Sequence, residues 1–323
     1  MSPEDVDIIF NNVLNICAAI QLPVKILSMY IVFRHSPKNM DALPIFILNG
    51  MSWNFVGNLL ASTLHLNPQY PSMCIRADGP ISNWTEREFV FQLFYGGIMT
   101  CIMNCGLAMS FAFPYRYLLL AYPDLVNNIK RFWGSMLFLA IHVSYSILFC
   151  ISYKFSMLSY DDYPDKEELP PRQRMFCFEP AGWRKNTYLV GALVVLLLTA
   201  TVINTFSVLL GRHLSKMKDI MSKKTLELHR KFLLYLLITT AVPVGFGGMP
   251  LFVCLLCSLF PHLPYNREMT MVSICVFMNH GTIYSIVSIV TFAPYYNAVK
   301  KMFRGFLGKP SVGVTITIRS SHY

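Results

Sequence analysis

Long apolar runs alternate with short polar segments along the chain. Seven of these runs exceed twenty residues and contain few or no charged side chains, so each is long enough to cross the roughly 30 Å hydrocarbon core of a bilayer as a helix. The pattern predicts an all-α membrane protein, a bundle of seven transmembrane helices within residues 8–296. The expected spans are residues 8–33, 43–66, 89–113, 132–153, 188–210, 232–260 and 269–292.

The third apolar run is the clearest of the seven. It carries no charge over residues 89–113 and ends at Pro114, after which Arg116 stands between two tyrosines. Tyrosine rings and a base both suit the headgroup level of a membrane. Arg116 and Tyr117 are therefore expected at the membrane surface, and Arg116 is the leading candidate for contact with a cytosolic partner.

The chain is less charged than a soluble protein. Of its 323 residues, 54% are hydrophobic and 14% are charged, against about 25% charged in soluble proteins. With residues 1–7 placed outside, the inner segments hold 17 bases and 4 acids, whereas the outer ones hold 9 bases and 13 acids. Positive charge collects on the cytoplasmic side, so we expect the N-terminus outside and the C-terminus inside. The net charge of +10 is then a signal of topology, and no nucleic-acid partner is expected.

Charged and metal-binding side chains are scarce inside the spans. None of the 17 acids falls in one, although transporters and proton pumps place carboxylates there. We therefore expect a neutral ligand and no ion coupling. Lys25 is the one base inside a span, and its long side chain is expected to reach the inner headgroups. His142 and His280 lie in separate spans and no HExxH motif is present, so we expect no enzyme activity, metal or cofactor.

Two outer loops carry covalent features. Cys74 and Cys177 are the only cysteines outside the spans. Because exposed free thiols are unfavourable in an oxidising compartment, a Cys74–Cys177 disulfide is favoured over two free thiols. Asn83 begins the only Asn-x-Ser/Thr sequon and is expected to be exposed. Its glycosylation is left open, because it lies close to the start of the third span.

The inner segment 211–231 contains seven bases. Two interpretations remain open: attraction to anionic lipid, worth about 1 kcal/mol per base near the surface, or a docking surface for a cytosolic partner. The candidate docking residues are Arg212, Lys216, Lys223 and Lys224.

The last two spans end in distinctive segments. Residues 243–250 hold two prolines and three glycines, which predicts a bend in the sixth span. Residues 297–308 have apolar positions at helical spacing, which predicts an amphipathic helix on the inner leaflet. Residues 309–323 are polar and are expected to form a disordered cytoplasmic tail.

A ligand pocket is expected to open to the outside between the third, fifth, sixth and seventh spans. Its candidate residues combine aromatic and sulfur surface with few polar groups, which suits a small and mostly apolar ligand. Each would alternatively be plain helix packing, which is the favoured interpretation for Met99 and Phe252. The candidates are Gln92, Tyr95, Met99, Phe252, Asn279 and His280.

Short motifs at the span ends resemble those of nematode seven-helix chemoreceptors of the Str superfamily, with classes D and H the nearest. These motifs are Pro23 and residues 35–40, the FPYRY sequence at residues 113–117, His280 with Gly281, and residues 294–296. The resemblance covers roughly residues 22–301. It implies a G-protein-coupled receptor for an environmental odorant or pheromone, located in the plasma membrane of sensory-neuron cilia and signalling through a heterotrimeric G protein.

The chain departs from the pattern at two positions. Tyr296 replaces an arginine that often follows Pro-Tyr in the family, and no acid stands beside Arg116, where rhodopsin-like receptors usually have one. An acid–arginine restraint on the inactive state is thus missing, which predicts raised basal activity.

Two other classes of protein compete with a receptor. A transporter or channel without G-protein coupling would be expected to show intramembrane charges or an inverted repeat, and the sequence shows neither. A membrane enzyme would need a metal cluster or an acid–base pair. We therefore expect a receptor without catalytic activity.

Overall fold

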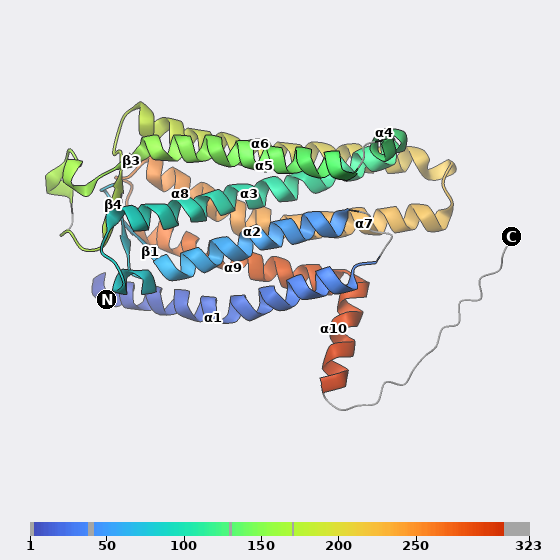
Figure 1. Ribbon diagram of the computed structural model, residues 1–323, viewed down its shortest axis with the longest axis horizontal. Helices are drawn as coiled ribbons and strands as arrows, with labels where there is room; N and C mark the ends of the chain where they lie inside the picture. Colours follow the sequence, from blue (N-terminus) through green and yellow to red (C-terminus); the bar gives the residue numbers. More distant parts are fainter. Residues whose placement is uncertain (1–2, 38–41, 129–130, 170, 307–323) are drawn as a thin grey trace.

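Long helices packed side by side form the body of the molecule (Figure 1). The computed structural model describes residues 3–37, 42–128, 131–169 and 171–306. Six of its helical segments are long and apolar enough to cross a membrane, and α2 is the seventh long segment of the bundle. The helices of the bundle are α1 (Pro3–His35), α2 (Leu43–Leu64), α3 (Glu88–Ala121), α5 (Arg131–Ser156), α6 (Trp183–Lys216), α7 (Lys223–Val242), α8 (Met249–Leu259) and α9 (Asn266–Thr291).

Several helices differ from the expected bounds. Pro114 does not end α3, which continues to Ala121 and so contains Arg116. The sixth span is interrupted as expected, because α7 and α8 are joined by a π-helical segment, η6 (Pro243–Gly248). The short helix α4 (Pro123–Asn128) was not expected. Helix α10 (Ala293–Phe306) begins four residues earlier than predicted and turns away from the bundle axis (Figure 1); residues 307–323, with the predicted tail, lie outside the described residues.

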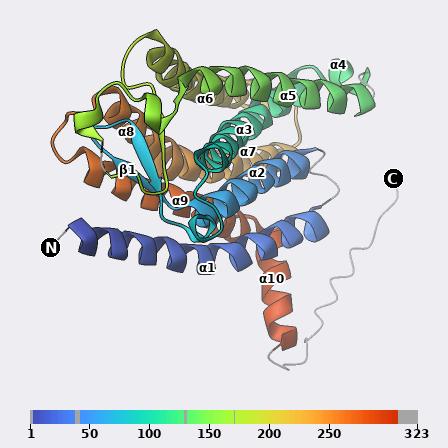
Figure 2. The same cartoon turned by 60° about the vertical axis from the view of Figure 1, so that its left-hand side comes forward.

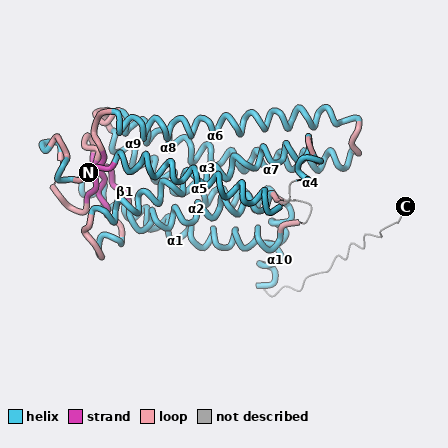
Figure 3. The backbone as a smooth tube through the Cα atoms, turned by 45° about the horizontal axis from the view of Figure 1, so that its top comes forward, coloured by secondary structure: helices cyan, strands magenta, loops and turns pink. Residues whose placement is uncertain are grey.

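A small antiparallel sheet covers the end of the bundle at which α1 begins; we call this the sheet end (Figure 3). Figure 2 turns it toward the viewer. The strands are β1 (Leu66–Gln69), β2 (Cys74–Ala77), β3 (Met157–Leu158) and β4 (Met175–Phe178), in the order β1-β2-β4-β3. No strand was predicted, because segments of two to four residues show no recognisable alternation. The opposite end, which holds Arg116 and the turn between α6 and α7, is called the basic end.

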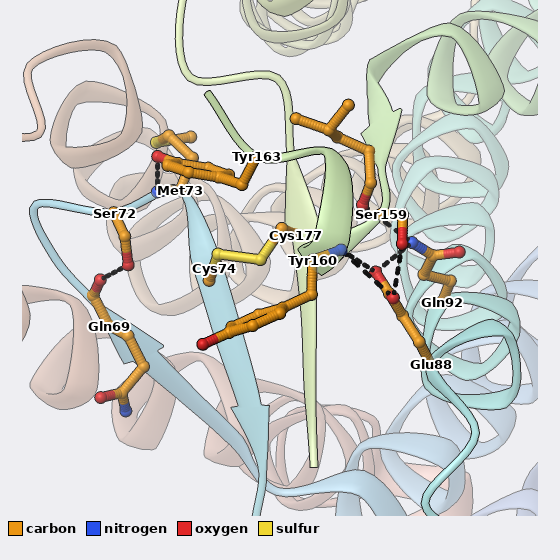
Figure 4. The surroundings of a disulfide bond; sticks show 11 residues. Gln69, Ser72, Met73, Cys74, Glu88, Gln92, Ser159, Tyr160, Tyr163 and Cys177 are labelled. Atoms are coloured by element: carbon orange, nitrogen blue, oxygen red, sulfur yellow. Dashed lines mark hydrogen bonds between the residues drawn. A yellow bond between two sulfur atoms is a disulfide. The ribbon is translucent and has the colours of Figure 1, made fainter. Parts of the chain in front are cut away.

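A disulfide joins two strands of the sheet, and hydrogen bonds fix the sheet and its loop to the helices. Cys74 and Cys177 lie opposite each other in β2 and β4 and are bonded, which confirms the predicted pairing. Figure 4 shows the surroundings of this bond. The backbone N–H of Met73 donates to the hydroxyl of Tyr163 at 3.1 Å, and the backbone N–H of Tyr160 donates to the Glu88 carboxylate at 3.2 Å. Helix α3 is thereby tied to the long loop that contains β3 and β4.

An ion-pair cluster joins α1, the sheet and the start of α9. Asp7 contacts Arg76 at 2.6 Å and Arg267 at 2.5 Å, while Arg76 also contacts Asp78 at 2.7 Å. The hydrogen bonds to Asp78 and Asp7 raise the pKa of the Arg76 guanidinium above its usual value. The cluster therefore stays ionised and holds three elements that are distant in the sequence.

Three asparagines of α2 bind neighbouring helices. Asn49 contacts Nε2 of His142 in α5 at 3.2 Å, and Nδ1 of the same ring lies 2.6 Å from Oδ1 of Asn104 in α3. Asn54 contacts His280 of α9, and Asn58 donates to Gln21 of α1 and to the Met278 carbonyl. Buried side-chain hydrogen bonds of this kind connect helices where there is no water to compete.

The expectation for Lys25 is wrong. Its side chain does not extend to the headgroups but lies in the interior with 2% of its surface exposed. The ammonium donates to Oε1 of Gln21 at 3.4 Å, and Gln21 is itself bonded to Asn58. The polar residues of α2 thus give this lysine a partly polar environment, which hydropathy along α1 does not reveal.

Candidate functional site

A cavity of about 260 Å³ lies in the middle of the bundle, beneath the sheet. Its walls come mainly from α2, α3, α6, η6, α8 and α9, and they are mostly apolar and rich in sulfur. Cysteine and methionine side chains are polarizable and adapt to irregular shapes. The central lining residues include Tyr95, Met99, Cys101, Cys105, Met109, Leu196, Leu251, Cys254 and Met278.

The roof of the cavity comes from the sheet, with Tyr70, Met73, Ile75 and Phe178 in its lining. Phe178 packs on Tyr95 of α3 with ring centroids 5.3 Å apart. The hydroxyl of Tyr70 lies 3.1 Å from Oγ of Ser258 in α8. Aromatic contacts and hydrogen bonds therefore hold the roof over the helices, while the disulfide joins β2 to β4 within the roof.

Asn54 and His280 form a polar pair deep in the cavity wall. Nε2 of His280 accepts from Nδ2 of Asn54 at 2.9 Å, and Nδ1 of the ring donates to the Phe277 carbonyl at 2.5 Å. Both ring nitrogens are engaged in a neutral imidazole, a tautomer that follows from the hydrogen-bond network. His280 thus offers a ligand its ring carbons rather than a free donor.

Lys185 and Glu179 are the charged residues in the lining of this cavity, and both lie at its sheet end. Lys185 has 7% of its surface exposed, and its ammonium donates to the Pro180 carbonyl at 3.0 Å. Glu179 is paired with Arg184 at 3.0 Å. From the sequence, Lys185 is only one of the loop charges, because its burial depends on how the loop before α6 folds back over the bundle.

Three of the six predicted ligand residues line the cavity and three do not. Tyr95, Met99 and His280 belong to the lining. Gln92 points instead to Glu88, which accepts from its Nε2 at 3.2 Å. Nδ2 of Asn279 donates to the Cys275 carbonyl at 2.8 Å, and Phe252 is outside the lining as well. Spacing along a helix could not show which side faced the cavity, because every face of these spans is apolar.

Arg116 is buried at the basic end, with 4% of its surface exposed. Its guanidinium lies 3.2 Å from Nδ1 of His229 and 5.0 Å from the ring centroid of Phe232, both in α7. Arginine stacks on aromatic rings through its planar guanidinium. Arg116 therefore connects α3 to the helix that leads into the π-helical segment.

The other predicted coupling residues also lie at the basic end, where Tyr117 packs between helices and the four bases are exposed. Tyr117 packs on Phe206 and His213 of α6, with ring centroids 5.8 and 6.2 Å apart. The four bases of the predicted docking surface are exposed near the end of α6 and the start of α7. They are Arg212, Lys216, Lys223 and Lys224.

Asn83 closes the short 3₁₀ helix η2 (Pro80–Asn83) at the sheet end. Its side chain is exposed, so the sequon is accessible in the folded chain. Its modification stays a prediction.

Comparisons with known proteins agree with this architecture. Residues 6–305 match the family model described as Serpentine type 7TM GPCR chemoreceptor Srh. The fold is similar to that of squid rhodopsin in its crystal structure, with a TM-score of 0.64 and 12% sequence identity over 95% of this chain and 88% of that chain. At this identity the likeness concerns the fold alone. No match is found among curated protein sequences.

Proposed function

The chain belongs to the Srh family of serpentine seven-transmembrane GPCR chemoreceptors, and from this premise we propose that it detects a small environmental chemical in the central cavity and signals through a heterotrimeric G protein. The observation that carries the proposal is the cavity itself, which is lined by helices of the bundle and roofed by a disulfide-bonded sheet. A concave, mostly apolar site with a few polar groups suits a small molecule.

The ligand we propose is an odorant or pheromone with a largely apolar body. The expectation of a neutral ligand rests on the lack of acids in the spans, and this argument excludes a cation more strongly than an anion. The sulfur and aromatic side chains of the lining provide polarizable contacts without charge.

The orientation we propose places the sheet end outside and the basic end in the cytosol. The charge difference of +13 inside against −4 outside, counted along the sequence, supports it through the positive-inside rule. An epitope tag inserted beside Ser222 should then stain cells only after permeabilisation. Residence in the plasma membrane of sensory cilia is part of the same proposal.

Cells that express the chain together with a G protein should give calcium responses to members of an odorant panel. Leu196→Trp is expected to abolish these responses, because Leu196 lines the cavity and the larger ring fills it. Leu197→Trp is the matched control, since the neighbouring Leu197 is 55% exposed on the outer surface of α6.

Two outcomes would contradict the proposal. Equal responses from the Leu196→Trp and Leu197→Trp variants would place the ligand elsewhere. Responses that persist when the G protein is omitted or inactivated would favour a channel or transporter instead.

A further inference from the structure

Lys185 is a buried cation at the sheet end of the cavity. Its exposed fraction is 7%, and an ammonium group has three donors. The described residues supply one acceptor within hydrogen-bond distance, the carbonyl of Pro180 at 3.0 Å. A lysine buried to this extent is rare unless it is paired, and its remaining donors are available to a ligand in the cavity that it lines.

The position of Lys185 in its helix adds to this cost. Lys185 is the third residue of α6, whose N-cap Gly182 has no side chain to accept from the first backbone N–H groups. These groups and the helix dipole favour a negative charge at this end and disfavour a positive one. The same location therefore attracts an anion through the helix end and through the lysine.

The nearby acid does not neutralise Lys185. Glu179 lines the same end of the cavity, but its carboxylate is paired with Arg184 at 3.0 Å. No ion pair between Lys185 and a carboxylate is present in the described part of the chain. With Glu179 paired to Arg184, Lys185 is the charged residue of the cavity lining that has no carboxylate partner among the described residues.

The cavity extends from Lys185 far into the bundle. On α6 its lining runs from Lys185 to Ile203, and these 18 helical steps correspond to about 27 Å. Leu189, Leu196 and Ala200 line the wall in between. A charged group at one end of a long apolar cavity matches an amphiphile.

We propose that Lys185 binds the carboxylate of a medium- or long-chain organic acid whose apolar chain lies along α6 in the cavity. The inference rests on the proposed function, because it names the class of chemical that the same cavity takes. A free acid is the occupant we propose, and the anionic headgroup of a membrane lipid is the alternative source of the same chemistry.

The first measurement is the binding of tritiated decanoic acid to the purified full chain in nanodiscs of phosphatidylcholine. Unlabelled decanoic acid should compete at a concentration about tenfold or more below that of methyl decanoate or decanol, because only the acid brings a charge to Lys185. Equal competition by acid and ester in the unchanged chain would overturn the inference without any variant.

Substitutions then assign the effect to the lysine. Lys185→Gln should remove the preference for the acid while methyl decanoate still binds, which also shows that the variant is folded. Lys185→Arg should restore most of the preference. Lys154→Gln is the matched control, because Lys154 is an exposed lysine near the end of α5. A Lys185→Gln chain that still prefers the acid contradicts the assignment.

Nanodiscs that contain phosphatidylglycerol separate the two sources of the anion. Unchanged decanoic acid binding in these discs supports a free acid, whereas suppression that requires Lys185 identifies the lipid headgroup as the occupant and overturns the inference.

Signalling assays distinguish a failure of this inference from a failure of the proposed function. If neutral odorants signal but acids neither bind nor signal, the inference fails and the proposed function stands; if acids bind at Lys185 but nothing signals, the proposed function fails.

Discussion

Gly247 lies against the imidazole of His280, so closely that a Cβ added at Gly247 would be 3.3 Å from Cδ2 of the ring. Gly247 belongs to the π-helical segment η6 and His280 to α9. The ring cannot easily move aside, because both of its nitrogens are hydrogen-bonded. The interrupted sixth span and the seventh span therefore approach each other at a point where only glycine fits without displacement.

Gly247→Ala is expected to destabilise the protein by about 1–3 kcal/mol, the range for overpacking a tight interior. Gly245→Ala is the control in the same segment, since nothing lies within 4 Å of its added Cβ. Alanine there should be neutral or stabilise by up to about 1 kcal/mol through helix propensity. Thermal denaturation of the two purified variants measures the difference. Equal midpoints would show that the close approach to His280 does not destabilise the Gly247→Ala variant.

Lys25→Met is expected to stabilise the chain by about 1 kcal/mol or more. Lys25 has 2% of its surface exposed and its ammonium contacts Gln21 at 3.4 Å, so its removal relieves a desolvation cost while the methionine keeps the volume. Lys154→Met changes an exposed lysine and should stay within about 0.5 kcal/mol. If thermal denaturation gives the same small change for both variants, Lys25 reaches the headgroups after all.

The seven-helix architecture could be predicted from the sequence, and the polar interior could not. A span is a local property, since twenty consecutive apolar residues suffice to indicate it. Lys25 and Lys185 are different, because their burial is decided by residues from distant segments: Asn58 of α2 beside Gln21, and the loop carbonyl of Pro180. Hydropathy treats each as an isolated base, and therefore placed both in contact with water or headgroups.

The disulfide could be predicted by counting the cysteines outside the spans, whereas the strands that carry it could not be predicted. Only two cysteines lie outside the spans, so Cys74 and Cys177 had one plausible partner each. The strands that carry them have four residues each and are defined by pairing across the bundle end rather than by a pattern within each strand. Gln92 and Asn279 could not be placed from the sequence either. Their side chains bond to Glu88 and to the Cys275 carbonyl, and neither residue belongs to the cavity lining.

The double variant Cys74→Ser with Cys177→Ser is expected to lose most of its surface expression. The bond closes a separation of 103 residues, for which chain-entropy models give a stabilisation of about 4–5 kcal/mol. Cys150→Ser serves as the control, because Cys150 is an exposed free cysteine of α5. Flow cytometry of tagged chains provides the measurement, and normal expression of the double variant would show that the sheet is held sufficiently by Glu88, Tyr163 and the aromatic contacts.

His229→Ala is expected to raise basal signalling. The ring nitrogen of His229 lies 3.2 Å from the guanidinium of Arg116, and this contact joins α3 to α7 at the basic end. Its loss removes one of the contacts that hold Arg116 against α7, of which the stacking on Phe232 is another, so the two helices separate more easily. His262→Ala, at a histidine on the loop between α8 and α9, is the control at the other end of the bundle. Ligand-free calcium signals at matched surface expression decide the outcome, and an unchanged baseline would mean that this contact does not restrain the inactive state.

Arg116→Lys is expected to lose most of the ligand-driven signal, and Arg116→Ala to lose all of it. Lysine keeps the charge but not the planar group that reaches His229 and stacks on Phe232 at once, and the two side chains are not interchangeable at such sites. A role limited to anchoring α3 at the headgroups would need only the charge, so lysine would then serve as well. Arg34→Lys is the matched control, because Arg34 is exposed at the end of α1 and is not among the predicted docking residues. The four chains are compared at equal surface expression by the agonist-dependent calcium response. Full signalling by Arg116→Lys would identify Arg116 as an anchor and exclude it from coupling, whereas a selective loss in this variant, with Arg34→Lys unaffected, places the coupling contact at Arg116.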